Sequence, residues 1–257
     1  MAAWGPSASN SSTPSPWPNA LSSLALLLIF PRRASLAKGK SKPTPHTPPP
    51  MKVPPSLLHL YAVTDRQWLH GRTLESQVRQ VLEGGATIIQ IREKCLGDQE
   101  FLQEARQIQA TCREFGAPLI INDNVEVALA IGAGLHVGQS DTACREARRR
   151  LGEQAILGVS CATVQQALEA QEAGADYLGV GAVFPTSTKL DADWVKRETL
   201  REICQAVSIP VVAIGGISRE NAATLAGTGI AGVAVVSALF AAPDPKAAAA
   251  AFSQIHY

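Results

Sequence analysis

Residues 86–123 read ATIIQIREKCLGDQEFLQEARQIQATCREFGAPLIIND, and this stretch decides the fold. It contains two short apolar runs, at 86–92 and 118–123, on either side of a longer polar segment with apolar residues at helical spacing. Consecutive apolar positions in a short run are typical of a parallel strand that is buried on both faces. Gly-Ala at 116–117 is a usual helix stop before the next strand. The stretch therefore predicts a strand–helix–strand unit.

The same alternation extends over the rest of the chain from Leu57 onward. Each further strand-like run is short, apolar and bounded by Gly, Pro or Asp. These runs are LHLYAVT (58–64), GLHVG (134–138), AILGVS (155–160), DYLGVGA (176–182), PVVAIGG (210–216) and GVAVVS (232–237). Helix-period segments follow them, among them 74–86, 98–117, 163–175, 219–230 and 244–255. Eight regularly spaced strand–helix pairs predict a single (β/α)8 TIM barrel over residues 57–257. A doubly wound sheet is the alternative, but no division into halves is visible.

Residues 1–56 form a Ser/Pro-rich extension with six Lys or Arg and no Asp or Glu. Proline at this density cannot build a helix or a central strand, so the segment is expected to be disordered. Its apolar run at 21–30 is too short to span a bilayer and is followed, not preceded, by basic residues, unlike a signal peptide. The composition resembles a transit peptide. The favoured interpretation is that Met51 is the true start, because predicted structure begins within ten residues of it.

Charge and cysteine content narrow the classes of partner. Residues 57–257 carry 17 basic and 22 acidic side chains, and aromatic residues make up 5% of the whole chain. An acidic, aromatic-poor body disfavours a nucleic-acid partner, and no apolar stretch is long enough for a membrane span. The five cysteines are odd in number and contain no CxxC pair, which favours reduced thiols in a cytoplasmic protein over disulfides or a zinc site. A homo-oligomer is compatible with this composition.

Polar residues gather at the predicted C-terminal strand ends, where (β/α)8 barrels carry their active sites. Three cations, from the ends of two strands, combine the bidentate fork of arginine with the point charge of lysine and suit a diphosphate. Two carboxylates from neighbouring strands are hard oxygen ligands that, with phosphate oxygens, suit Mg²⁺. The cations are Arg92, Lys94 and Lys189, and the carboxylates are Asp123 and Asp141.

A second phosphate site is predicted after the last two strand runs. Gly215-Gly216 and Val236-Ser237 follow the runs at which many barrels bind a monophosphate. Glycines let backbone N–H groups approach a phosphate closely. A diphosphate end with magnesium and a separate monophosphate end together suggest two phosphorylated substrates.

Five motifs resemble the thiamine-phosphate synthase family over residues 58–252. They are Gln90-Ile-Arg-Glu-Lys94, Ile121-Asn-Asp123, His136-Val-Gly-Gln139 followed by Asp141, Gly181-Ala-Val-Phe-Pro-Thr-Ser-Thr-Lys189 and Ala213-Ile-Gly-Gly216. The resemblance implies a transferase that joins hydroxymethylpyrimidine diphosphate to hydroxyethylthiazole phosphate and releases pyrophosphate. It also implies a dissociative, Mg²⁺-assisted substitution, in which cations stabilise the negative charge of the leaving group.

The resemblance assigns roles to individual residues. The pyrimidine diphosphate would be held by Gln90, Arg92, Lys94, Asn122, Ser160 and Lys189, with Ile91 and Glu93 of the same motif in the binding set. Among these, Arg92, Lys94, Lys189 and Ser160 would be catalytic. Asp123 and Asp141 would bind Mg²⁺. The thiazole phosphate would be held by Thr186, Ser187, Thr188, Gly216, Val236 and Ser237.

Two departures from the family pattern bear on the alternatives. Ser187 stands where relatives often carry a lysine, and Ala162 stands near a position where they often carry a histidine. A related barrel, the thiazole tautomerase, uses a histidine in that region, so its absence together with a complete diphosphate and Mg²⁺ set favours the synthase. A non-catalytic regulator that binds thiazole phosphate is the third hypothesis; loss of Asp123, Asp141 or Lys189 would indicate it, and none is lost.

Other chemically active side chains are given structural roles. His59 and His136 are predicted to be strand or core residues. Cys161 lies beside the predicted site, but without a nearby histidine it is not expected to act as a nucleophile.

Overall fold

A computed structural model describes residues 52–139, 141–186 and 194–257, without the side chains of residues 141 and 142. Eight strands follow one another around a closed barrel, and every neighbouring pair is parallel. The (β/α)8 prediction is therefore confirmed. Each strand lies inside its predicted run, except that β5 extends one residue beyond it. The strands are β1 (Leu60–Val63), β2 (Ile88–Ile91), β3 (Leu119–Asn122), β4 (Gly134–Val137), β5 (Leu157–Cys161), β6 (Tyr177–Val180), β7 (Val211–Ile214) and β8 (Gly232–Val235).

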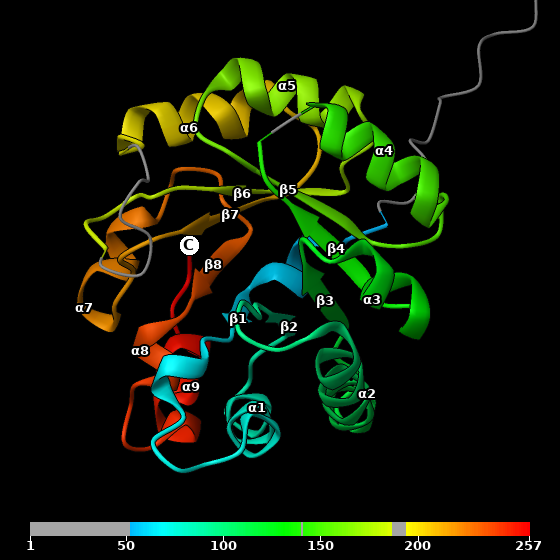
Figure 1. The fold of residues 1–257 in the computed structure, drawn as a ribbon. Coiled ribbons are helices and arrows are strands. Elements are labelled where there is room, and N and C mark those ends of the chain that lie inside the picture. The colour runs from blue at the N-terminus through cyan, green and yellow to red at the C-terminus, as the bar shows by residue number, and fades with distance from the viewer. Residues whose placement is uncertain (1–51, 140, 187–193) are drawn as a thin grey trace, which may run out of the picture. The chain divides into compact units, whose positions relative to one another are not determined.

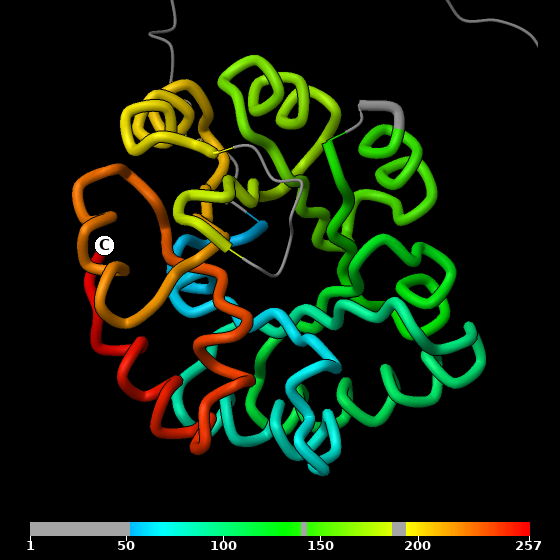
Figure 2. The backbone as a smooth tube through the Cα atoms, turned by 60° about the vertical axis from the view of Figure 1, so that its left-hand side comes forward, coloured from blue at the N-terminus to red at the C-terminus, as the bar shows by residue number. Residues whose placement is uncertain are grey.

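The helices form an outer ring around the strands (Figures 1 and 2). In the described ranges none of them is long and apolar enough to cross a membrane. The α-helices are α1 (Leu74–Glu83), α2 (Asp98–Glu114), α3 (Val125–Ile131), α4 (Asp141–Leu151), α5 (Val164–Glu172), α6 (Arg197–Ala206), α7 (Arg219–Ala222), α8 (Ser237–Phe240) and α9 (Pro245–Ser253). Short 3₁₀ turns are η1 (Pro55–Leu58), η2 (Arg66–Trp68) and η3 (Ala223–Leu225).

Capping residues set where several helices begin and end. Thr73, Thr163 and Asp244 each accept a hydrogen bond from the backbone N–H three residues on, at the starts of α1, α5 and α9. The predicted helix over 219–230 is shorter in the structure. It ends at η3, because Gly227 and Gly229 have φ of 75° and 95°, a left-handed conformation that no α-helix continues.

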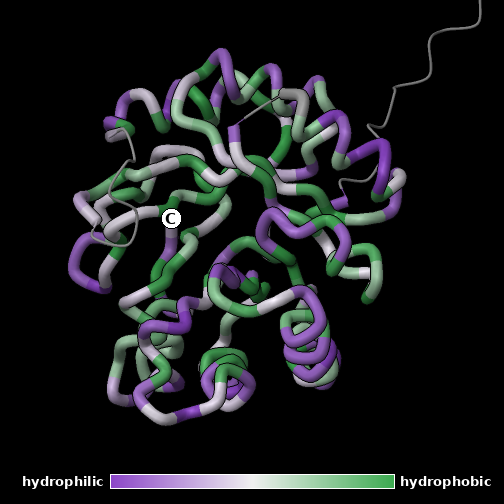
Figure 3. Tube along the Cα trace, viewed as in Figure 1, coloured by the Kyte–Doolittle hydropathy of each residue, from purple (hydrophilic) through white to green (hydrophobic). Residues whose placement is uncertain are grey.

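Alternation along the strands produces two apolar layers. Side chains that point outward pack against the helices, and those that point inward fill the barrel. Figure 3 shows the strands as mainly hydrophobic and the outer turns of the helices as largely hydrophilic. The inward cluster comprises Val53, Leu58, Tyr61, Val63, Ile88, Ile120, Tyr177, Val212 and Ala234.

Residues 52–56 belong to the barrel, although the sequence placed them in the extension. Val53 is buried in the inward cluster, and the Lys52 ammonium lies 2.9 Å from the carboxylate of Asp176. These contacts close the barrel at the N-terminal ends of its strands, which we call the lower end. The opposite end, at the C-terminal ends of the strands, is the upper end. The rest of the predicted extension lies outside the described residues.

Candidate active site

A cavity of about 280 Å³ opens at the upper end, and all eight strands or the loops that follow them contribute to its lining. Ten of the predicted site residues line it together. They are Gln90, Arg92, Lys94, Asn122, Asp123, Ser160, Thr186, Gly216, Val236 and Ser237. Ser187, Thr188 and Lys189 lie outside the described residues. Asp141 begins α4 in its backbone, and its side chain is likewise outside the described part.

Ile91 and Glu93 do not line the cavity, which differs from the prediction for these two residues. Strand alternation explains Ile91. Its neighbours Gln90 and Arg92 face the cavity, so Ile91 faces the helical layer, where it is fully buried. A contiguous motif in a strand therefore contributes only every second side chain to a site.

Glu93 instead folds the loop that follows β2. One carboxylate oxygen accepts hydrogen bonds from the backbone N–H groups of Lys94, Cys95 and Leu96, at 2.8, 2.5 and 3.0 Å. The other accepts from the Arg66 guanidinium at 2.7 Å. Burial would raise the Glu93 pKa, but these hydrogen bonds and the adjacent positive charge outweigh burial and lower the pKa. Glu93 thus fixes the backbone that carries Lys94.

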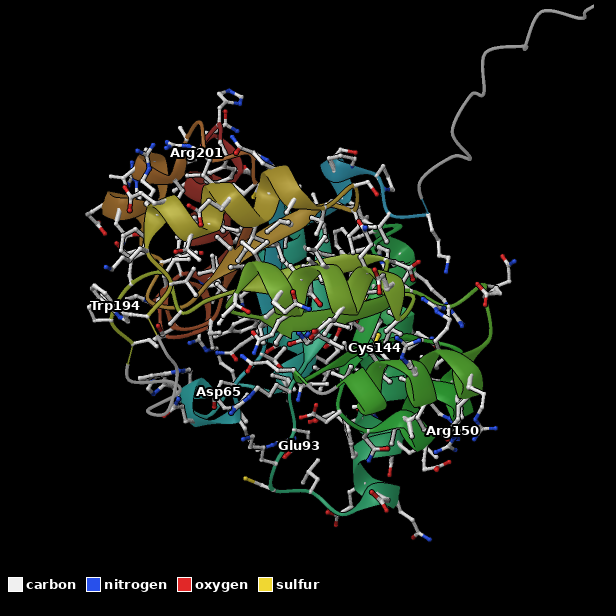
Figure 4. The ribbon with its side chains drawn as sticks, turned by 90° about the horizontal axis from the view of Figure 1, so that it is seen from above. Asp65, Glu93, Cys144, Arg150, Trp194 and Arg201 are labelled. Carbon is white, nitrogen blue, oxygen red and sulfur yellow. The ribbon has the colours of Figure 1, made fainter. Side chains whose placement is uncertain are left out.

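The loop after β1 supports Arg92 in a similar way. The backbone N–H of Arg92 donates to the Thr64 hydroxyl at 3.2 Å, and its guanidinium lies 3.8 Å from the Asp65 carboxylate. Figure 4 shows Asp65 and Glu93 on the same side of the barrel, in the loops that follow β1 and β2. The loop after β1 therefore supports Arg92 directly and Lys94 through the Arg66–Glu93 pair, and both residues line the cavity.

Asp123 presents an exposed carboxylate at the cavity. Its φ is 62°, a left-handed conformation that aspartate tolerates better than most residues. Its backbone N–H donates to the carbonyl of His136 at 2.9 Å, and the Asn122 amide donates to its carboxylate at 2.7 Å. Two neighbouring strands thus fix a hard oxygen ligand at the rim.

The carboxylate of Asp123 suits a Mg²⁺ ion that takes only some of its ligands from the protein. Among the described residues no group of three or more Asp, Glu, His or Cys side chains could hold a metal. A magnesium ion at Asp123 would complete its shell from phosphate oxygens, water and the predicted second ligand, Asp141. Mg²⁺ is commonly bound by one or two carboxylates with substrate phosphates in this way.

The glycine pair after β7 is required by close packing as well as by backbone conformation. Gly215 and Gly216 have φ of 98° and 63°, and a Cβ on Gly215 would lie 2.6 Å from that of Ala182. A Cβ on Gly216 would overlap the carbonyl oxygen of Pro185. Beside it, after the neighbouring strand β8, the four-residue helix α8 begins at Ser237. The N–H groups of Leu239 and Phe240 donate to the carbonyl of Val236 at 3.1 and 3.0 Å, whereas those of Ser237 and Ala238 have no acceptor within the helix. These two backbone segments follow neighbouring strands, where the sequence predicts a phosphate site.

A chain of hydrogen bonds crosses the barrel beneath the cavity. Gln90 Nε2 donates to the Tyr61 hydroxyl at 3.1 Å, and the Tyr61 and Tyr177 hydroxyls are 2.7 Å apart. The Tyr177 hydroxyl lies 3.0 Å from His136 Nδ1, and His136 Nε2 lies 2.9 Å from Ser160 Oγ. His136 is a strand residue, as predicted, but it also lines the cavity.

Sequence reasoning missed this chain, although a signal for it was present. Tyr61, Tyr177 and His136 occupy inward strand positions, where polar atoms need partners. Small residues at neighbouring inward positions, Gly158 and Gly179, mark the space that large rings fill. A Cβ on Gly158 would overlap the Tyr177 ring, and one on Gly179 would lie 3.1 Å from His136 Cε1.

Cys161 is not part of this hydrogen-bond chain; its side chain belongs to the apolar layer between the strands and the helices. Burial, with a smaller contribution from nearby Cys204, raises the pKa of its thiol to about 12. Such a thiol carries almost no thiolate at neutral pH, so a nucleophilic role is disfavoured, in agreement with the sequence.

The closed barrel and the cation- and carboxylate-lined cavity at its upper end define the class: a (β/α)8-barrel protein with its candidate site at the C-terminal ends of the strands. The family model described as thiamine monophosphate synthase matches residues 60–239. The chain belongs to this family.

Individual relatives agree with the family match. A thiamine-phosphate synthase of Ruminiclostridium cellulolyticum is 51% identical over 191 residues, which are 74% of this chain and 91% of that protein. A probable thiamine biosynthetic bifunctional enzyme, chloroplastic, of Oryza sativa is 48% identical over 198 residues, 74% of this chain and 36% of that protein. The solved structure of a thiamine phosphate pyrophosphorylase from Pyrococcus furiosus matches with a TM-score of 0.72 and 40% identity, covering 78% of this chain and 96% of that one.

Proposed function

We propose that the protein joins hydroxymethylpyrimidine diphosphate to hydroxyethylthiazole phosphate, forming thiamine phosphate and pyrophosphate. The observation that supports the proposal is that cations, a carboxylate and a glycine- and serine-bearing backbone line one and the same cavity. Arg92, Lys94 and Asp123 line it on one side, and Gly216 and Ser237 line it on another. Two phosphorylated substrates can therefore meet in one space with their phosphates apart.

The reaction exchanges one bond for another at the pyrimidine methylene carbon. The bond from this carbon to the diphosphate oxygen breaks, and its electron pair leaves with the pyrophosphate. The lone pair of the thiazole ring nitrogen then forms the new carbon–nitrogen bond. This nitrogen carries no proton, so the step needs no general base.

The chain's own residues act on the charge of the leaving group. Arg92 and Lys94 place positive charge beside the pyrophosphate as its negative charge grows, and Lys189 is proposed to join them. Ser160 and Asn122 supply polar contacts from β5 and β3. When bound at Asp123 and Asp141, Mg²⁺ would supply additional positive charge to the diphosphate oxygens.

The thiazole phosphate is assigned to the other end of the cavity. Gly216, Val236, Ser237 and Thr186 line that end, and Ser187 and Thr188 complete the proposed set from the sequence. Binding here would leave the thiazole ring directed toward the diphosphate end, where the methylene carbon lies in this proposal.

A steady-state assay with each substrate varied tests the proposal. The purified protein with both substrates and Mg²⁺ should form thiamine phosphate and pyrophosphate in equal amounts. Arg92→Ala should abolish most of this activity, whereas Arg149→Ala, which removes an exposed arginine from α4, should leave it unchanged. Isomerised thiazole phosphate without thiamine phosphate would instead indicate the tautomerase, and binding of thiazole phosphate without turnover would indicate the regulator.

The proposed location is the cytoplasm, on the ground of the five cysteines without a paired motif. The name of the rice relative places that protein in the chloroplast. A fluorescent reporter fused to residues 1–50 and imaged in a eukaryotic cell tests the alternative. Import of the reporter into an organelle would replace the cytoplasmic assignment.

A further inference from the structure

We propose that His136 is a positioning residue that orients the Ser160 hydroxyl toward the cavity, and that Tyr177 holds His136 in the tautomer this requires. The inference deepens the proposed function and rests on it for its kinetic consequence. It starts from the continuous chain Gln90–Tyr61–Tyr177–His136–Ser160, which has a cavity-lining residue at each end.

The direction of the hydrogen bonds follows from donor counting. A tyrosine hydroxyl has one hydrogen to donate. Gln90 Nε2 donates to Tyr61, so the Tyr61 hydrogen is directed to Tyr177, its other partner in the chain. Tyr177 accepts that hydrogen and donates its own to His136 Nδ1, 3.0 Å away.

The tautomer of His136 follows in turn. A neutral imidazole that accepts at Nδ1 carries its hydrogen on Nε2. Nε2 therefore donates to Ser160 Oγ at 2.9 Å. Because Ser160 accepts this bond, its own hydrogen remains for a group bound in the cavity that Ser160 lines. The reverse tautomer would draw the serine hydrogen back toward the histidine.

Packing keeps the chain in this arrangement. Tyr61 and Tyr177 are almost completely buried, and His136 is 8% exposed. The ring centroids of Tyr61 and Tyr177 are 5.8 Å apart, and those of His136 and Tyr177 are 5.6 Å apart. The absence of side chains at Gly158 and Gly179 provides the room for these rings. Burial also raises the pKa values of both tyrosines, so they remain neutral donors at physiological pH.

The functional consequence lies at the leaving group. A hydroxyl that donates to a diphosphate oxygen stabilises charge that grows as the carbon–oxygen bond breaks. Loss of its orientation should lower kcat and leave the KM for thiazole phosphate unchanged, because that substrate is assigned to the other end of the cavity.

A double-mutant cycle tests whether Tyr177 acts through Ser160. Tyr177→Phe keeps the ring and removes the hydroxyl, and it should lower kcat by about 10-fold to 100-fold. In a Ser160→Ala background the same change should cost less than about 2-fold, because the group it orients is gone. Equal losses in both backgrounds would overturn the proposal. Tyr257→Phe is the matched control, because it removes a buried hydroxyl that is not part of this hydrogen-bond chain, and it should leave kcat unchanged.

A spectroscopic measurement on the unsubstituted protein makes the test independent of any folding defect. Nitrogen-15 NMR of histidine-labelled protein should show His136 with its proton on Nε2, and Tyr177→Phe should shift this signal. A proton on Nδ1 in the unsubstituted protein would overturn the assignment. The NMR result stands even if no thiamine phosphate is formed, so failure of this inference is distinguishable from failure of the proposed function.

Discussion

The two ends of the barrel interior are built from the same strands but from different chemistry. At the lower end Ile88, Ile120 and Val53 fill the barrel with buried aliphatic side chains. At the upper end the same strands continue into Gln90 and Asn122, which line the cavity. Tyr61 and Tyr177 belong to the same inward cluster, and their hydroxyls are hydrogen-bonded to Gln90 and His136, which line the cavity. Along each strand, a step of two residues therefore leads from core to candidate site.

This difference explains how one barrel can be both stable and reactive. Apolar burial at the lower end supplies stability, while the upper end carries polar groups whose partners are neighbouring loops. Changes at the lower end should therefore alter unfolding, and changes at the upper end should alter catalysis. Substitutions at the two ends test this separation.

Ile120→Ala should have the largest effect on stability. It removes a fully buried side chain from the lower end and should cost about 2–5 kcal/mol in the free energy of unfolding. Urea unfolding of the variant measures this. The kcat per folded molecule should remain close to that of the unsubstituted protein. A normal unfolding curve with reduced kcat would contradict the separation of the two ends.

Arg92→Ala should have the opposite profile. Loss of one preorganised positive group beside the leaving pyrophosphate should lower kcat by about 10²–10³, equivalent to about 2.7–4 kcal/mol in the activation barrier. Its pair with Asp65 is long and partly exposed, so stability should change by less than about 1 kcal/mol. Steady-state kinetics and thermal unfolding decide between this outcome and a purely structural role, for which Tm alone would fall.

Asp123→Asn should raise the magnesium requirement by about 10-fold to 100-fold. Asparagine tolerates the left-handed backbone at this position, so the fold should be retained. Activity measured against Mg²⁺ concentration tests the prediction, and unchanged Mg²⁺ dependence would make the carboxylate structural. Asp123→Ala is a less suitable variant, because alanine is strained at positive φ.

Glu93→Gln should have the smallest effect, a loss of about 1 kcal/mol in the free energy of unfolding at neutral pH. The amide oxygen of glutamine can still accept some of the backbone N–H hydrogen bonds that Glu93 accepts. The folded pKa of Glu93 is lowered, so the contribution of its charge is complete above the ordinary carboxyl value of 4.5 and is lost as the pH falls through the folded pKa. The stability difference between the two proteins should therefore shrink below about pH 4. Urea unfolding at a series of pH values checks this; a difference independent of pH would exclude the charge as its cause.

The strand pattern could be predicted from sequence because each strand is a short apolar run ended by Gly, Pro or Asp. It was harder to predict which residues of a strand motif face the cavity. The sequence predicts that all five residues of Gln90-Ile-Arg-Glu-Lys94 bind substrate, but alternation turns Ile91 outward and Glu93 folds the loop. The family resemblance names a motif, whereas the backbone decides which of its side chains reach the cavity.

Contacts between distant segments could not be read from the sequence. His136 lies 41 residues from Tyr177 and 24 from Ser160 in the sequence, and the pairing of β4 with β5 and of β5 with β6 brings the three together. Val53 falls in the predicted extension because the segment up to residue 56 is rich in proline, yet it is buried in the barrel's inward cluster. Trp194 follows β6 in the sequence, is 62% exposed and projects from the surface in Figure 4. The sequence analysis makes no prediction for this residue.

A crystal structure of the protein with thiamine phosphate, pyrophosphate and Mg²⁺ tests the central claim most directly. We expect pyrophosphate oxygens within hydrogen-bond distance of Arg92 and Lys94, with the ion at Asp123. We expect the phosphate of thiamine phosphate at the backbone of Gly216 and Ser237. Pyrophosphate at the Gly216 end, or both products bound outside the cavity, would contradict the account.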